Sequence, residues 1–569
     1  MAENIPELRK RQPAAHGGGV RGDQYVARSS LFEGRFGRMF RSLPPAVWPV
    51  EALMALGATG NMTSEPETGD KDPRLPAAAR ENPKKRIQDD EENAGIAAGY
   101  TYLGQFIDHD ITFDPASSLQ QQNDPMALID FRTPRLDLDS VYGRGPDDQP
   151  YMYDGKKFRL GRPLFDLDQA TKARDLPRFS DPNDPNGAKR ALIGDKRNDE
   201  NVIVSQLHAA VLQFHNKLVD DPAHKTATFQ EIQQHMRWHY QWIVVNDFLV
   251  TICGEDVVND ILPHRRKNLP IWKNPPRFQL YKWRTDPFMP IEFSAAAYRF
   301  GHSMVRPIYR LNTRLNGGDD PLKATPDEIE RGLDGRFFIF AGVQRRGLNG
   351  FDEFPKQWAI DWSLYFDVKG SIKNVGKRRV QPAYKIDTSL VDPLGFLPEF
   401  CQPARAPQPP LTVEQLHSVP IDPVNNPANL AQRNLLRGLR MGLPSGQDVA
   451  RSMGIEPIRD RDLRVGKAVV EDWDSNPTLA SIHDSFIGRA PLWYYVLAEA
   501  QYEWIQRATG RGGKGDEEPL RLGTIGGRIV AETLLGLLWG DGHSYLRQAP
   551  NWTPATIRSI GELIDFALT

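Results

Sequence analysis

Apolar residues recur with a helical period in several blocks of the chain, from about residue 92 onward. Strand patterns are sparse and short, and the connections between the blocks are long and rich in Pro and Asp, as surface loops are. The pattern therefore predicts a mainly α-helical fold with few short strands and long loops. The predicted helices are 93–109, 202–219, 229–251, 294–307, 430–439, 491–507 and 525–539.

The N-terminal part of the chain differs from the rest. Residues 1–85 lack a sustained apolar period and are interrupted by three consecutive glycines at 17–19 and by Pro44-Pro45. We therefore predict that they form an extended arm that wraps on the body. No low-complexity linker and no solenoid-type repeat divides the remaining sequence. Residues 86–569 are accordingly predicted to form one large domain.

Charge and cysteine content exclude several classes of protein. The 71 basic and 73 acidic residues give a net charge of −2, which lacks the basic surplus expected of a nucleic-acid or anionic-membrane partner. Two cysteines cannot form a disulfide framework. The longest apolar stretches are too short to span a bilayer, and the polar start has no apolar signal core. We expect a cytoplasmic protein, or one secreted without a classical signal peptide.

The densest group of reactive side chains lies in the segment 104–110, GQFIDHD. On a helix, Gln105 and His109 share a face because they are four residues apart, while Asp108 and Asp110 flank that face. Taken alone, such an Asp-His-Asp triplet is more typical of a solvated helix end than of an active site.

Two further segments combine charged groups with predicted helices. The segment 194–200, GDKRNDE, enters a predicted helix with Arg197 and Glu200 on one face. An apolar predicted helix carries His302, with Arg299 three residues earlier. Each feature alone has an ordinary explanation, namely an acidic helix N-terminus and a histidine satisfied by a backbone carbonyl.

Together, these three segments resemble the animal-type haem peroxidases of the peroxidase–cyclooxygenase superfamily. The matching motifs are GQFIDHD at 104–110, GDxRxxE at 194–200 and RFGH at 299–302, with further agreement in PLWYY at 491–495 and GGRIVAE at 526–532. The resemblance runs from about residue 90 to about residue 545. It implies a large haem peroxidase domain that reduces hydrogen peroxide at a ferric haem and oxidises small organic donors, halides or thiocyanate. It also implies a role in the response to oxidative stress.

The resemblance assigns roles on one side of the haem. His109 would be the general base that takes a proton from hydrogen peroxide and returns it to the departing oxygen. Arg197 would stabilise the charge that develops on the leaving oxygen. Gln105 would position water, peroxide or a small anion beside the iron.

On the opposite side, the resemblance makes His302 the ligand of the haem iron, with Gln447 accepting its other N–H where the family usually has Asn. Arg299 would pair with a haem propionate. Asp108 and Glu200 match the two carboxylates that form ester bonds to haem b methyl groups in many family members. The resemblance therefore allows two covalent links to the haem.

The resemblance also implies a calcium site, formed by Asp110 and the segment 133–139. Alternate residues Thr133, Arg135, Asp137 and Asp139 project to one side of an extended loop and offer hydroxyl, carbonyl and carboxylate oxygens, which suit a hard cation. The family commonly has an aromatic residue at position 135 and Ser at position 139, so this chain adds a third acid. A solvated Asp-rich turn is the alternative.

Two other functions and one other metal are open at this stage. A fatty-acid dioxygenase of the same superfamily carries a radical tyrosine three residues before the iron ligand, but Arg299 occupies that position and Tyr298 is one step off. A catalytically inactive scaffold is disfavoured because the histidines and Arg197 are all present. His235 and His239 have a spacing that can hold zinc, but no third ligand suggests itself.

Overall fold

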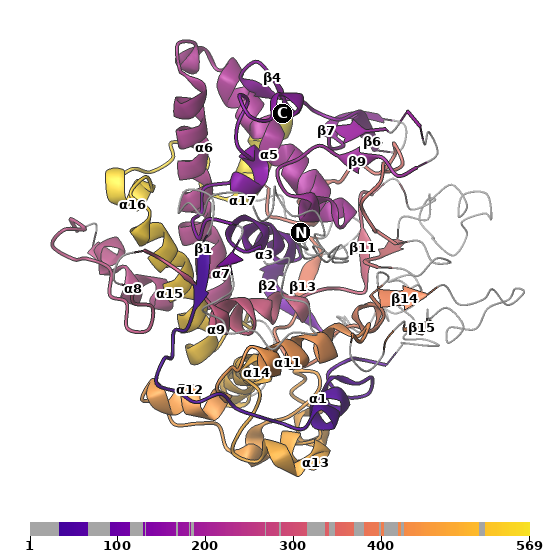
Figure 1. Cartoon of the computed structure of the whole chain (residues 1–569), viewed down its shortest axis with the longest axis vertical. Helices are drawn as coiled ribbons and strands as arrows, with labels where there is room; N and C mark the ends of the chain where they lie inside the picture. Colours follow the sequence, from indigo (N-terminus) through magenta and orange to yellow (C-terminus); the bar gives the residue numbers. More distant parts are fainter. Residues whose placement is uncertain are drawn as a thin grey trace, which may run out of the picture.

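Helices make up most of the regular structure in the computed structural model, and the strands are short (Figure 1). The predicted mainly helical fold class is therefore confirmed. The structure describes residues 34–65, 91–113, 129–130, 132–166, 169–180, 182–183, 187–267, 269–283, 286–313, 315, 336–340, 347–368, 380–397, 400–402, 419–420, 422, 426–510 and 518–569.

The elements follow one another along the chain in this order. The α-helices are α1 (Val50–Gly57), α3 (Gly99–Ile111), α4 (Asp139–Tyr142), α5 (Val202–Asp220), α6 (Phe229–Ile243), α7 (Leu249–Cys253), α8 (Glu255–Ile261), α9 (Ile291–Ser294), α11 (Leu430–Arg440), α12 (Gly446–Ser452), α13 (Leu479–Ile482), α14 (Leu492–Gly510), α15 (Thr524–Gly540), α16 (Tyr545–Gln548) and α17 (Ile560–Leu568). The strands are β1 (Gly34–Gly37), β2 (Glu92–Ala97), β3 (Ile129–Asp130), β4 (Tyr153–Asp154), β5 (Lys157–Phe158), β6 (Pro163–Asp166), β7 (Gln169–Arg174), β8 (Arg178–Phe179), β9 (Arg190–Ala191), β10 (Met289–Pro290), β11 (Ile308–Arg310), β12 (Arg336–Phe338), β13 (Pro382–Tyr384), β14 (Cys401–Gln402) and β15 (Val419–Pro420).

Helices α5 and α6 begin where local capping groups satisfy their free N–H groups. Asn201 caps α5, since its Oδ1 accepts from the backbone N–H of Ile203 and Val204 at 3.1 and 2.9 Å. A capping box of Thr228 and Glu231 starts α6. Both helices begin within a residue of the positions predicted from the apolar period.

The predicted helix 229–251 is broken by a π-helical turn, η7 (Val244–Phe248), between α6 and α7. Asp247 in this turn accepts a hydrogen bond from the Tyr100 hydroxyl at 2.5 Å and from the Ile560 backbone N–H at 2.8 Å. Contacts with segments far away in the sequence therefore accompany the irregular turn, which the local pattern could not reveal.

Two other predicted helices differ from the structure at their ends. The segment predicted as helix 93–109 begins as strand β2, which pairs antiparallel with β13, and α3 starts only at Gly99. A Cβ at Gly99 would lie 2.3 Å from the Phe366 ring, so glycine permits this close start. The segment predicted as 294–307 contains the end of α9 and a 3₁₀ helix, η9 (Ala297–His302).

The described part of the predicted arm, residues 34–65, lies against the body. Strand β1 pairs in parallel with β10 and antiparallel with β3, and α1 packs against α11. Gln432 of α11 donates to the Met54 carbonyl at 3.0 Å. The prediction of an extended segment was wrong at α1, because eight residues are too few for an apolar period to register. The division into residues 1–85 and 86–569 stays a prediction.

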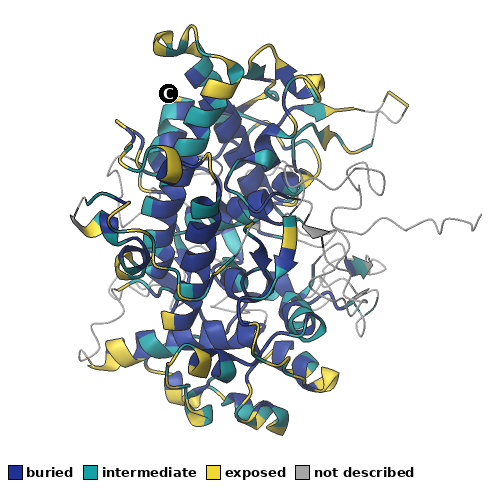
Figure 2. Ribbon diagram, turned by 60° about the vertical axis from the view of Figure 1, so that its left-hand side comes forward, coloured by how far each residue is buried: buried dark blue, intermediate teal, exposed yellow. Residues whose placement is uncertain are grey.

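One continuous apolar core joins the described segments. It contains Phe36 and Leu53 from the N-terminal segment, Phe106 from α3 and Ile564 from α17. Figure 2 shows buried residues through the interior helices and exposed residues at the periphery. Within the described residues, no helix combines the length and the apolar composition needed to cross a bilayer.

Candidate active site

Helix α3 carries four of the predicted site residues on adjacent faces. His109 and Asp110 are buried, whereas Gln105 and Asp108 are half-buried in a helix that is otherwise mostly buried. The Thr112 hydroxyl, just after the helix, donates to Asp108 Oδ1 at 3.1 Å. The side of α3 that carries Gln105 and Asp108 is therefore more open than the side that carries Asp110.

His109 is fixed by a neighbour from the GDxRxxE segment. Its Nδ1 lies 2.9 Å from Oδ1 of Asn198 in the 3₁₀ helix η5 (Lys196–Asp199). With a carbonyl oxygen facing Nδ1, the proton of the neutral ring sits on Nδ1 and Nε2 keeps its lone pair. Burial, followed by the charge of Arg197, lowers the pKa of His109 to about 4. The imidazole is therefore neutral near pH 7 and has Nε2 available as a base.

Arg197 lies at the end of α3 and is held by several acceptors. Its Nη2 lies 2.8 Å from Asp195 Oδ2 and donates to the carbonyls of His109 and Thr112 at 3.0 and 2.6 Å. Its guanidinium also stacks over the Phe113 ring, 4.7 Å from the centroid. The structure thus brings Arg197 next to the backbone of His109, with its guanidinium tied to Asp195.

Gln105 and Glu200 meet on the open side of α3. Gln105 Nε2 donates to Glu200 Oε2 at 3.4 Å, and its Oε1 accepts from Asn201 Nδ2 at 3.1 Å. Asn201, as the cap of α5, is fixed in turn by that helix. The two motifs that are separate in sequence therefore meet through the side chains of Gln105, Glu200 and Asn201.

His302 ends the 3₁₀ helix η9, and its Nδ1 lies 2.8 Å from Nδ2 of Asn434 in α11. The sequence prediction that Gln447 would be this partner was wrong. Gln447 lies in the first turn of α12, where it accepts from the Ala490 N–H at 2.7 Å and donates to Asp460 at 3.4 Å. The sign that could have identified Asn434 is its place as a buried amide on the apolar face of an amphipathic helix.

Positive charge gathers around His302. Burial, followed by Arg437 of α11, lowers the pKa of Arg299 to about 9. Burial, Arg299 and Arg437 lower the pKa of His302 to about 3. Arg299 Nε is buried and has no hydrogen-bond partner among the described residues. This side of the site is therefore suited to a ligand that brings negative charge, and Arg437 is a residue that the sequence analysis missed.

The two histidine-bearing segments are joined directly. The Tyr298 hydroxyl of η9 donates to the Gly104 carbonyl of α3 at 3.2 Å. The negative charge of Asp108 also acts on Arg299, because it opposes the fall in the pKa of that guanidinium. A Cβ at Gly301, next to His302, would meet nothing within 4 Å, so open space adjoins the ring-bearing turn.

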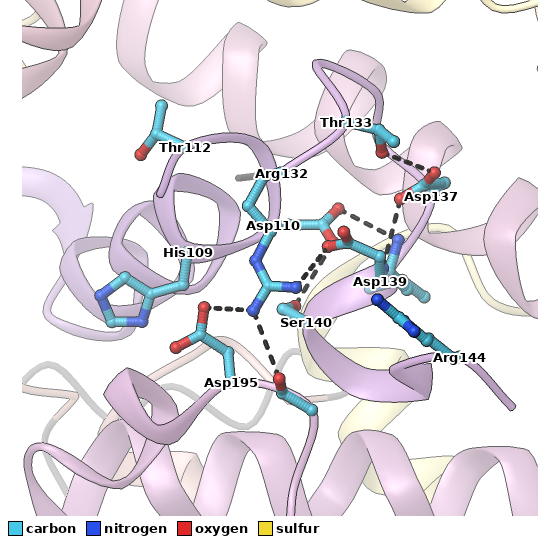
Figure 3. Close-up of polar contacts among 12 residues, drawn as sticks. His109, Asp110, Thr112, Arg132, Thr133, Asp137, Asp139, Ser140, Arg144 and Asp195 are labelled. Carbon is cyan, nitrogen blue, oxygen red and sulfur yellow. Dashed lines mark hydrogen bonds and ion pairs between the residues drawn. The ribbon is translucent and has the colours of Figure 1, made fainter. Parts of the chain in front are cut away.

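Three carboxylates form a cluster on the enclosed side of α3 (Figure 3). Oxygen atoms of Asp110, Asp137 and Asp139 lie within 4.8 Å of one another. The Thr133 hydroxyl donates to Asp137 Oδ2 at 2.9 Å. Burial and the two other aspartates raise the pKa of Asp110 well above its usual range. Mutual repulsion of this kind is relieved when a cation binds.

The loop geometry explains how neighbouring acids reach one point. Leu138 adopts a left-handed conformation with φ of 58°, which turns the chain between Asp137 and Asp139. Its backbone N–H donates to Asp110 Oδ2 at 3.2 Å, so the loop is fastened to α3. Arg135 lies in the same loop, and its N–H donates to the Thr133 carbonyl at 2.7 Å.

The second metal considered from the sequence, zinc at His235 and His239, gains no support. The two rings lie 4.7 Å apart with planes inclined by only 25°, and the His224 ring lies 5.0 Å from His235. Nearly parallel stacked rings do not aim their lone pairs at one ion. In the part of the chain that the structure describes, the group with convergent ligand atoms is the cluster of Asp110, Asp137 and Asp139, called the acidic trio below.

Comparisons with known proteins point to one family. The family model for the animal haem peroxidase matches residues 116–327, a range that includes the loop 133–139, Arg197 and His302. A peroxidase-like protein from Margaritifera margaritifera is 26% identical over 319 residues, which cover 46% of this chain. That alignment spans only 38% of the relative's own length.

Two solved structures align over most of this chain at low sequence identity. Fatty acid alpha-dioxygenase from Arabidopsis thaliana superposes with a TM-score of 0.50 at 14% identity, covering 92% of this chain and 76% of that one. Peroxidase A from Dictyostelium discoideum gives a TM-score of 0.49 at 14% identity, covering 94% and 92%. At 14% identity, the likeness to the Arabidopsis thaliana enzyme concerns the fold alone.

Proposed function

We propose that this chain, which carries an animal haem peroxidase domain, binds haem b between His109 and His302 and reduces hydrogen peroxide. The observation that carries the proposal is the pair of neutral imidazoles, buried at His109 and half-buried at His302, on segments joined by the Tyr298–Gly104 hydrogen bond. Bound haem would supply a ferric iron that accepts an oxygen atom from peroxide. Removal of peroxide would suit a response to oxidative stress.

The residues around His302 fit such a group. Haem carries two propionates, and the buried, unpartnered Nε of Arg299, with Arg437 close by, offers positive charge to bind them. A His302 that stays neutral can ligate iron through Nε2. The ring then carries its proton on Nδ1 and needs an acceptor, which Asn434 provides when its amide turns Oδ1 toward the ring.

On the opposite side, His109 Nε2 would take the proton of hydrogen peroxide and return it to the departing oxygen. Asn198 holds the tautomer that this transfer requires. Gln105, which is oriented by Asn201 and Glu200, would donate to peroxide or to water. Arg197 would stabilise the negative charge on the leaving oxygen once its guanidinium turns from the carbonyls that it now contacts.

We further propose ester links from Asp108 and Glu200 to methyl groups of the haem, with hydrogen peroxide as the two-electron oxidant of each methyl group and water as its product. Both carboxylates are half-buried on the open side of α3, where they accept hydrogen bonds from Thr112 and Gln105. The acidic trio of Asp110, Asp137 and Asp139, together with the Thr133 hydroxyl and the Arg135 carbonyl, would hold calcium. Because Asp110 follows His109 directly, the ion would stabilise the part of α3 that carries the base.

Small organic donors, halides or thiocyanate are the proposed reductants. The fatty-acid dioxygenase alternative is disfavoured by the surroundings of Tyr298. Its hydroxyl donates to the Gly104 carbonyl, and its ring stacks on Phe293 with centroids 4.5 Å apart. The position three residues before His302 is held by Arg299, which cannot form a tyrosyl radical.

Two assays on haem-loaded protein separate these activities. We expect rapid consumption of hydrogen peroxide with a chromogenic donor, and no oxygen uptake with linoleate. Oxygen uptake without peroxide consumption would reverse the order of the two functions. Stable haem with no spectral response to peroxide would instead favour the inactive scaffold.

A further inference from the structure

Arg132 is a buried arginine that bridges two aspartates from different parts of the site (Figure 3). Its Nη1 lies 3.2 Å from Asp139 Oδ1, its Nη2 lies 2.5 Å from Asp195 Oδ2, and only 3% of the side chain is exposed. The Arg132 Nη2 also donates to the Gly194 carbonyl at 3.3 Å. A Cβ at Gly194 would lie 2.5 Å from the Ser140 carbonyl oxygen, so glycine lets the two segments approach each other.

Asp139 and Asp195 each take part in a second interaction. Asp139 belongs to the acidic trio, and Asp195 Oδ2 also receives Nη2 of Arg197 at 2.8 Å. Burial alone would raise the pKa of Asp195, but the guanidiniums of Arg197 and Arg132 hold it well below its usual range. A continuous line of ionic contacts therefore runs from the acidic trio through Arg132 and Asp195 to Arg197.

We propose that Arg132 is a positioning residue that couples cation binding at the acidic trio to the strength of the ion pair between Asp195 and Arg197. The inference deepens the proposed function and rests on it. When a divalent cation binds Asp139, it competes with Arg132 for that carboxylate. The ion pair of Arg132 with Asp195 then becomes stronger. Because Arg197 shares Asp195 Oδ2, its own ion pair with Asp195 becomes weaker. Cation binding thus frees Arg197 to turn toward a ligand at the iron.

The charge balance supports this role. Asp110, Asp137 and Asp139, when all are ionised, together with Arg132 carry two net negative charges, which one divalent cation balances. A guanidinium stays protonated in proteins, so Arg132 supplies a fixed positive charge beside Asp139. Asp139, the acid that this chain adds to the trio, is therefore matched by Arg132, an internal cation that also contacts Asp195.

The first test measures calcium affinity on the full chain as purified, after treatment with a chelator, by isothermal titration. Arg132→Met removes the cation that competes for Asp139, so calcium binding should tighten by about tenfold or more. Arg178→Met is the matched control, because Arg178 is 5% exposed and bridges Asp175 and Asp199 at 3.0 and 2.7 Å, outside the acidic trio. The control should keep the wild-type affinity.

Unchanged or weaker calcium binding in Arg132→Met, or no calcium binding in any of these proteins, would overturn the inference. If Arg132→Met does not fold, Arg132→Lys in the second test decides whether Arg132 couples the two sites. Lysine keeps the charge but, as a single point cation, does not bridge both carboxylates as a planar guanidinium does.

The second test follows Arg197 through fluoride binding to haem-loaded protein, read from the absorption spectrum. Calcium should tighten fluoride binding by about fivefold or more in the wild type, and this effect should vanish in Arg132→Lys. An equal calcium effect in both proteins, or none in the wild type, would contradict the coupling. A protein that takes up no haem would contradict the proposed function, while the calcium affinities still decide the role of Arg132.

Discussion

The two sides of the candidate site differ in how their charges are balanced. On the side of α3, Arg197 and Arg132 are paired with Asp195 and Asp139, and His109 is bonded to Asn198. On the side of η9, burial and neighbouring cations lower the pKa values of both His302 and Arg299. On the α3 side each of these arginines is thus paired with a carboxylate of the protein, whereas the η9 side has positive charge to offer. A haem iron with two propionates fits this asymmetry.

The largest effect is expected from the η9 side. His302→Ala removes the proposed iron ligand, so the purified variant should lose its haem absorption band even after incubation with hemin. His235→Ala is a suitable control, because this half-buried histidine lies outside the site. Full retention of haem by His302→Ala would remove His302 from the role of ligand.

On the α3 side, the haem should remain while the reaction slows. His109→Ala deletes the proposed base, so peroxide cleavage should slow by about two or more orders of magnitude. Stopped-flow absorption after mixing with peroxide measures this rate. An unchanged rate would show that another group takes the proton.

A smaller effect separates the two candidate partners of His302. Asn434→Leu removes the polar neighbour of Nδ1 and should weaken haem binding by about 10- to 100-fold. Gln447→Leu should leave haem affinity unchanged, since Gln447 contacts Ala490 and Asp460 instead. Both affinities come from hemin titration, and the reverse pattern would restore Gln447 as the partner.

The pH dependence of peroxide cleavage tests the electrostatics on the α3 side. Burial and Arg197 lower the pKa of His109 to about 4, and only the unprotonated ring accepts a proton. The rate should therefore stay level as the pH falls from 8 to about 5, and then decrease toward 4. A decrease centred near 6.5, the ordinary value for histidine, would show that His109 is not perturbed in this way.

How well the sequence predicted each feature depends on where its determinants lie. Helices α5 and α15 were predicted closely, because their long apolar periods are encoded locally. The start of α3 was not, because β2 pairs with a strand far along the chain. The same limit applies to the site. The motifs named His109, Arg197 and His302 as candidates, which stay predictions, but the Asn434 and Arg132 contacts join segments whose proximity only folding creates.

Haem binding with reactivity toward peroxide is the central claim, and an absorption spectrum of the purified protein tests it most directly. We expect a Soret band in the isolated or hemin-incubated protein that shifts on addition of one equivalent of hydrogen peroxide and returns when a donor is supplied. Protein that stays colourless after incubation with hemin, or a band that peroxide does not move, would contradict the claim.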